Sequence, residues 1–121
     1  MITLKRKTGD EGEDKAAEFL KAKGYKILAR NYASKYGEID IIARLKNAIV
    51  FVEVKTRASM SYGGGVAAVN VSKQNKITKT AITYIKENKP KFDSITFDII
   101  TITDGKIEHI QNAFAIEGYT I

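Results

Sequence analysis

The sequence predicts an α/β domain in which two helices flank a central mixed β-sheet. Two segments have the apolar spacing of amphipathic helices, and five have the alternating or continuously apolar pattern of strands. Their order is helix, strand, strand, strand, helix, strand, strand, which favours a sheet covered by helices over an all-β fold. A chain of 121 residues is long enough for one hydrophobic core, so we expect a single domain over residues 1–121.

Composition and charge narrow the classes of function. The chain is 44% hydrophobic and 28% charged, as is typical of soluble globular proteins, and no apolar run approaches the length of a membrane span. We therefore expect no membrane partner and, by default, a cytoplasmic location. The absence of cysteine excludes disulfides, thiolate catalysis and cysteine-ligated zinc, and a single histidine disfavours a histidine-based site. A net charge of +6 favours a polyanionic partner such as nucleic acid.

The first helix is predicted from a capping box. Thr8 would be the N-cap and Glu11 its partner three residues later, with the helix running to about Lys23 and stopping at Gly24. Glu13 falls on the apolar face of this helix. It either interacts favourably with the helix dipole in the first turn or serves beside a metal, and the sequence leaves both open. The apolar residues on that face are Ala16, Ala17 and Leu20.

Three strands are expected to follow. Residues 25–31 alternate well enough for a strand, and residues 32–37 form a polar connector. Residues 37–43 and 49–57 are then two strongly apolar, β-branched arms of a hairpin. After them, residues 58–65 have the glycine and serine content of a mobile loop.

Charged residues interrupt both arms of this hairpin. Glu38 and Asp40 lie in the first arm, and Glu53 and Lys55 lie in the second. Burying an unpaired charge is costly, so such residues need a partner, a metal or a cleft. An ordinary exposed sheet face is the least favoured reading, because residues 49–54 are apolar on both faces of the strand, as in a covered strand.

The register of the hairpin decides whether these charges meet. A turn on Lys46 and Asn47 places Asp40 opposite Glu53, and Glu38 opposite Lys55, on one face of the sheet. Opposed Cβ atoms are about 4.5–5.5 Å apart, so two carboxylates there repel unless they share a proton or a cation such as Mg²⁺. Lys55 on the same face can then orient a water molecule or a phosphate oxygen.

A second helix is predicted from Lys73 to about Glu87, with Ser72 as its N-cap. Gln74 leads its apolar face, and it either points toward the charged site or forms a hydrogen bond at the start of the helix. The second helix also carries four lysines. They form either an ordinary solvated face, which is the more common case, or a surface that binds successive phosphates of a nucleic acid. They are lysines 73, 76, 79 and 86. The predicted inward residues are Gln74, Ile77, Ala81, Tyr84 and Ile85.

The last elements are two strands. Pro90 ends the helical region, Ser94–Thr103 alternates as a strand, and Asp104-Gly105 is a hairpin turn into residues 106–110. We interpret Asp98 as structural and expect His109 to face solvent on an edge strand. The tail over residues 112–121 is expected to pack on the sheet.

These residues also carry a resemblance to a known family. Asp40, twelve intervening residues and then Glu53-Val54-Lys55 resemble the D…ExK signature of the PD-(D/E)xK nucleases, which have the restriction-endonuclease-like fold. The extended pattern resembles the bacterial YraN family, small uncharacterised proteins regarded as distant relatives of archaeal Holliday junction resolvases. The matching segments are Gly12-Glu13, Gly24-Tyr25, residues 30–32, 37–40 and 52–57, Ala68-Val69, Lys73, Ala81 with Tyr84, and Ala113-Phe114.

The resemblance implies a Mg²⁺- or Mn²⁺-dependent phosphodiesterase. Asp40, Glu53 and the backbone carbonyl of Val54 would be metal ligands, and Lys55 would position or activate the attacking water. Glu13 would assist the metal shell from the first helix. A homodimer is also implied, because resolvase relatives act on symmetric junctions. The expected substrate contacts are Gln74, Lys73 and Arg57.

Two functions follow from the sequence. The first is a metal-dependent DNA endonuclease that is selective for branched or junction DNA. The alternative is a nuclease-like module that binds nucleic acid or a protein with little or no catalysis, supported by the basic balance of the chain and the lack of a separate reading module.

Overall fold

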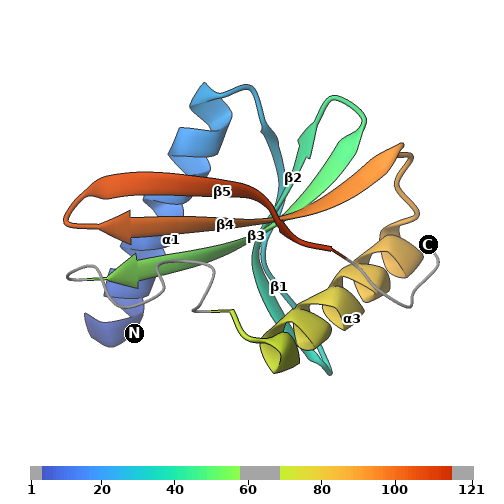
Figure 1. Cartoon of the computed structure of the whole chain (residues 1–121), viewed down its shortest axis with the longest axis horizontal. Coiled ribbons are helices and arrows are strands. Elements are labelled where there is room, and N and C mark those ends of the chain that lie inside the picture. The colour runs from blue at the N-terminus through green and yellow to red at the C-terminus, as the bar shows by residue number, and fades with distance from the viewer. Residues whose placement is uncertain (1–3, 58–68, 116–121) are drawn as a thin grey trace.

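The computed structural model describes residues 4–57 and 69–115, with side chains from residue 11 onward, and confirms the predicted order of elements (Figure 1). The predicted mobile loop over residues 58–65 and the end of the tail lie outside the described residues. No helix in the described part is long and apolar enough to cross a membrane. The elements are α1 (Leu4–Ala22), β1 (Lys26–Ser34), β2 (Gly37–Leu45), β3 (Ala48–Arg57), α3 (Val71–Asn88), β4 (Ser94–Thr103) and β5 (Lys106–Phe114).

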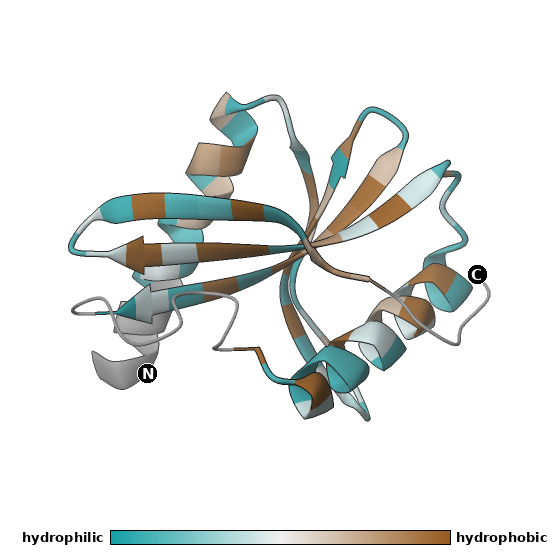
Figure 2. Ribbon diagram, viewed as in Figure 1, coloured by the Kyte–Doolittle hydropathy of each residue, from teal (hydrophilic) through white to brown (hydrophobic). Residues whose placement is uncertain are grey.

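The five strands form one mixed sheet in the order β1-β2-β3-β4-β5. Neighbouring strands are antiparallel except β3 and β4, which are parallel because the chain crosses over through α3 between them. This is an α/β fold consistent with the restriction-endonuclease-like architecture. Apolar positions recur along the strands in Figure 2, while α3 alternates between hydrophobic and hydrophilic positions, as expected for a helix lying on a sheet.

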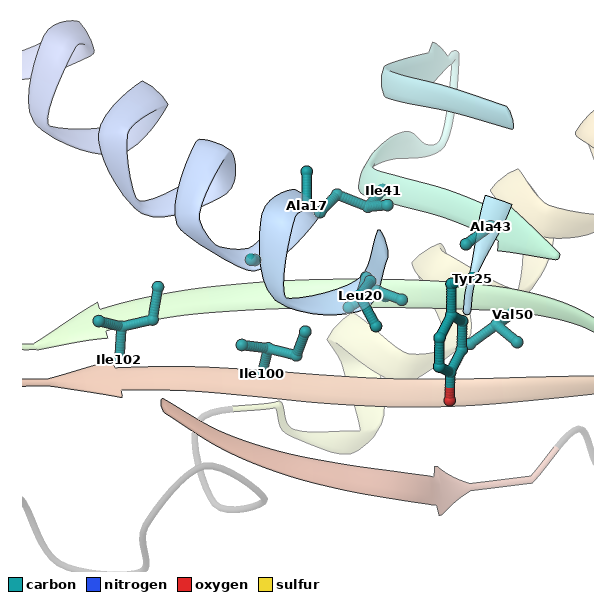
Figure 3. Close-up of a cluster of buried hydrophobic side chains, with 10 residues drawn as sticks. Ala17, Leu20, Tyr25, Ile41, Ala43, Val50, Ile100 and Ile102 are labelled. Carbon is teal, nitrogen blue, oxygen red and sulfur yellow. The ribbon is translucent and has the colours of Figure 1, made fainter. Parts of the chain in front are cut away.

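Each face of the sheet has its own core. The predicted apolar face of α1 packs on one side, where Leu20 lies in one buried cluster with Ile41, Val50 and Ile100 (Figure 3). On the other side α3 packs through Ile77, Ala81 and Tyr84 against a different set of strand residues. Alternate side chains of β3 enter the two cores, so this strand is buried on both faces, as its continuous apolar run predicts. The residues of the second core on the strands include Ile42, Ile49, Phe51, Phe97 and Ile99.

The end of α1 is as predicted, and its beginning is not. Helical backbone starts at Leu4, four residues before the predicted N-cap Thr8, so the capping box prediction is wrong. At the other end Gly24 has a φ of +93°, and its amide donates to Lys21 O while the Tyr25 amide donates to Leu20 O. This pair of bonds is a Schellman motif, in which glycine adopts the left-handed conformation without a Cβ penalty.

The cap of α3 also differs from the prediction. The helix begins at Val71, and the N-cap is Asn70 rather than Ser72, because the Asn70 side chain accepts a hydrogen bond from the Lys73 amide at 2.9 Å. Asparagine and serine are about equally good N-caps, so the sequence could not decide between two candidates this close together.

The prediction that His109 faces solvent is wrong. It lies on the edge strand β5, but its side chain is only 3% exposed, and its Nε2 lies 2.7 Å from Asp98 Oδ2. The rings of Phe19 and Tyr25 contact its imidazole edge-on. Asp98 also accepts a hydrogen bond from the Asn112 amide at 3.0 Å, which agrees with its predicted structural role. The pair thus ties β5 to β4 beneath the end of α1.

Candidate metal site

The hairpin of β2 and β3 has the predicted register. Leu45 pairs with Ala48 across the turn, and the pairing continues to Ile41 and Val52. Lys46 adopts the left-handed conformation in that turn, with a φ of +55°. One further step in the same register brings Asp40 opposite Glu53. Glu53 alternates with Phe51 and therefore faces the α3 side of the sheet.

Backbone pairing between β2 and β3 stops at this point, and a side chain continues it. The Val54 amide donates to Asp40 Oδ2 at 2.8 Å, so the carboxylate accepts the hydrogen bond that a backbone carbonyl of β2 would otherwise accept. This bond fixes Asp40 beside the second strand. It uses one carboxylate oxygen, so Asp40 is both a structural cap and an acidic member of the site.

Glu53 is the buried acid of the pair, with 6% of its surface exposed. Burial, followed by the hydrogen bond and the negative charge of Asp40, raises its pKa to about 8, although Lys73 acts in the opposite direction. Lys73 Nζ lies 3.2 Å from Glu53 Oε2. Two carboxylates are therefore held where both can be ionised only if positive charge is nearby.

Two lysines meet at these carboxylates. A hydrogen bond with Lys73 is the main reason why the pKa of Lys55 is lowered, and burial and the charge of Lys73 lower it further. Burial acts to lower the pKa of Lys73 as well, but its contacts with Lys55, Glu53 and Asp40 outweigh that effect and raise the pKa. Lys55 is thus the lysine that loses its proton more readily.

The other predicted acids lie elsewhere. Glu13 belongs to α1, on the other face of the sheet, and its Oε1 is 3.6 Å from Arg30 Nη2. Glu38 is exposed and pairs with Ala33 of β1, and the β2–β3 pairing does not extend to the predicted contact between Glu38 and Lys55. Among the described residues no group of three histidines, cysteines, aspartates or glutamates is placed to hold a metal. A role for Glu13 in the metal shell stays a prediction.

The predicted substrate contacts have different positions. Gln74 Nε2 donates a hydrogen bond to Val69 O at 2.9 Å. This confirms the interpretation in which Gln74 forms a hydrogen bond at the start of the helix. Arg57 is the last residue of β3 and is half-buried. Lys73 reaches across from α3 to Glu53, a contact that the sequence did not predict. The only signal for it was a lysine in the first turn of a lysine-rich helix, and that signal does not specify a partner.

Asp40 and Glu53 fit a magnesium ion. Mg²⁺ keeps several waters and is usually bound through one or two carboxylates plus substrate phosphates, not through a closed cage of protein ligands. Two carboxylates held side by side with no third acid among the described residues match that ligand set. Oxygen ligands also suit Mn²⁺.

Comparisons with known proteins identify the family that the chain matches. Residues 12–102 match the model of the uncharacterised protein family UPF0102. A UPF0102 protein of Sulfurihydrogenibium is 45% identical over 113 residues, which cover 93% of this chain and 98% of the relative. A UPF0102 protein of Thermodesulfovibrio yellowstonii is 49% identical over 106 residues, covering 88% of this chain and 94% of the relative. One from Caldanaerobacter subterraneus is 48% identical over 117 residues, covering 91% and 96%.

Proposed function

The chain belongs to the uncharacterised protein family UPF0102, and we propose that it is a Mg²⁺-dependent endonuclease that hydrolyses phosphodiester bonds in DNA. The observation that carries the proposal is the meeting of Asp40, Glu53 and Lys55 at the point where β2 and β3 stop pairing. Carboxylates that share a cation beside a lysine with a lowered pKa can support metal-assisted hydrolysis, with a group ready to accept a proton.

Each residue has a distinct part in the proposed reaction. Asp40 and Glu53 would hold the ion together with the Val54 carbonyl, and a bound ion would supply Lewis-acid polarisation of the scissile phosphate and of a water molecule. Lys55, in its neutral form, accepts the proton that the attacking water loses as its oxygen bonds to phosphorus. The bond from phosphorus to the leaving oxygen breaks, and that oxygen takes a proton from solvent water. Lys73 offsets the charge of Glu53 and presents an ammonium group to the phosphate.

The proposed substrate is DNA because the chain has a net charge of +6 and two lysines, Lys55 and Lys73, lie beside the two acids of the site. With one small domain, phosphate contacts and shape would dominate over the reading of base sequence. Selectivity for branched or junction DNA and action as a homodimer are parts of this proposal, since a junction presents two equivalent strands.

A second candidate is a module that binds nucleic acid without cutting it. The observation in its favour is the ion pair between Lys73 and Glu53. A lysine at 3.2 Å from the buried acid already supplies positive charge, so the acids do not strictly require a metal.

One assay separates these candidates. Purified protein is incubated with labelled single-stranded, duplex, flap and four-way-junction DNA in Mg²⁺, in Mn²⁺ and in EDTA, and the products are resolved by gel. We expect endonucleolytic products in either metal and none in EDTA. Binding of the junction without cleavage of any substrate would favour the binding module, and equal cleavage in EDTA would contradict a metal-dependent site.

A further inference from the structure

An exposed tyrosine lies among lysines at the tip of the hairpin of β1 and β2. Tyr36 is 38% exposed, one of the few large hydrophobic residues that the described surface presents to solvent. The ammonium groups of Lys35 and Lys79 lie 5.2 and 5.5 Å from the centre of its ring. Both lysines are exposed, so the ring lies among solvent-exposed positive charges and not within the apolar core.

The turn that carries Tyr36 is fixed to α3. The Tyr36 amide donates to Ser34 Oγ at 3.0 Å, and Ser34 Oγ lies 2.9 Å from Thr80 Oγ1 of α3. A Cβ on Gly37 would lie 3.8 Å from Lys76 Cβ, which shows how closely the hairpin approaches the helix. A ring on a short, anchored turn loses little conformational freedom when it binds a ligand.

A row of lysines connects Tyr36 with the candidate metal site. Lys73, Lys76 and Lys79 follow one another at three-residue intervals on α3, so they form a slanted stripe on one side of the helix. Lys73 contacts Glu53 at one end, and Lys79 contacts Tyr36 at the other. With a rise of 1.5 Å per residue, these two lysines are about 9 Å apart along the helix axis. Glu38 is the exposed acid nearest to Tyr36 in sequence, and the lysines outnumber it.

We propose that Tyr36, Lys35 and Lys79 form a stacking site for an unpaired base of a nucleic-acid strand whose phosphates follow Lys76 and Lys73 toward Glu53. The base would stack on the tyrosine ring while the lysines move to the flanking phosphates, the combination by which proteins bind single strands. At the spacing of one strand in a duplex, about 3.4 Å per nucleotide, 9 Å corresponds to two or three stacked nucleotides between Tyr36 and the cleavage point. The position of the cleavage point rests on the proposed function, whereas the stacking site itself does not. A duplex hides its base faces, so the site would favour strands with unpaired bases near the cut.

The test is a binding titration in EDTA, where no metal-dependent cleavage interferes. Fluorescence anisotropy would follow a labelled twelve-nucleotide dT strand, the same strand with abasic residues, and a duplex of equal length. Loss of one stacked base corresponds to about 5- to 150-fold weaker binding, which we expect for Tyr36→Ala on the dT strand. Tyr36→Phe keeps a ring and should bind normally, and Lys106→Ala on exposed β5 is the charge control.

Salt and base content distinguish stacking from charge. Tyr36→Ala should leave the slope of log K against log salt unchanged, whereas Lys79→Ala should reduce it by about 0.7, the value for one phosphate contact on a single strand. The effect of Tyr36→Ala should vanish on the abasic strand and on the duplex. Normal dT binding by Tyr36→Ala, or an equal loss with Tyr36→Phe, would overturn the stacking site. If the protein cuts no nucleic acid but the Tyr36 pattern persists, only the proposed endonuclease function fails.

Discussion

Glu53→Gln is expected to reduce metal-dependent cleavage about 10³-fold or more. Glutamine keeps the size of the side chain and an oxygen that can accept a hydrogen bond from Lys73, but it removes the negative charge of a proposed metal ligand. Loss of metal stabilisation amounts to several kcal/mol in the transition state, and each 1.36 kcal/mol is about tenfold in rate. Single-turnover rates in Mg²⁺ measure the effect, with the exposed carboxylate Glu108→Gln as a control.

The same variant is expected to be more stable than the wild type at alkaline pH in EDTA. The folded state raises the pKa of Glu53 from 4.5 to about 8, so the stability from this group is present below pH 4.5 and is lost as pH rises through about 8. Glutamine does not titrate and avoids that loss. Urea denaturation at pH 5 and at pH 9 should therefore show similar stabilities at pH 5 and a more stable variant at pH 9. If Glu53→Gln cleaved at the wild-type rate, Glu53 would have no role in the catalytic site.

His109→Ala is expected to lower the free energy of unfolding by about 1–3 kcal/mol, the usual cost of leaving a buried hydrogen-bonding group without its partner. Asp98, itself only 2% exposed, would keep its bond from the Asn112 amide but lose the imidazole. The variant also removes the ring contacts with Phe19 and Tyr25. Urea denaturation measures the loss.

Two further variants make that measurement specific to the pair. Glu108→Ala changes an exposed neighbour on the same strand and should shift stability by less than about 0.5 kcal/mol. The double variant Asp98→Asn/His109→Ala should cost less than the sum of the single variants, because the two side chains contact each other. Additive losses, or a His109→Ala variant as stable as the Glu108→Ala control, would show that the pair does not hold β5 in place.

Local patterns in the sequence predicted the metal-site hairpin well because its geometry is local. A two-residue turn sets the register, and the alternation of side chains then places Asp40 and Glu53 together. The end of the first helix at Gly24 was predicted equally well, since the left-handed conformation that often ends a helix favours glycine. In these segments the residues that decide the structure are close together in the chain.

Predictions failed where distant segments decide the structure. His109 was expected to be exposed because edge strands usually have a solvated face, but the end of α1 and Tyr25 cover it. A register shift between Phe97 and Ile99 accompanies Asp98 on the neighbouring strand, and no alternation pattern indicates it. The contact of Lys73 with Glu53 depends on where α3 crosses the sheet. Tertiary packing sets that position, and local sequence patterns do not show it.

We propose that Asp40 and Glu53 share one divalent cation. Titration of Mn²⁺, followed by the electron paramagnetic resonance of the unbound ion, tests it without requiring a substrate. We predict one Mn²⁺ per chain, displaced by Mg²⁺, in the wild type and in Glu108→Gln, and at least tenfold weaker binding in Asp40→Asn and in Glu53→Gln. Wild-type affinity in both site variants would contradict the claim.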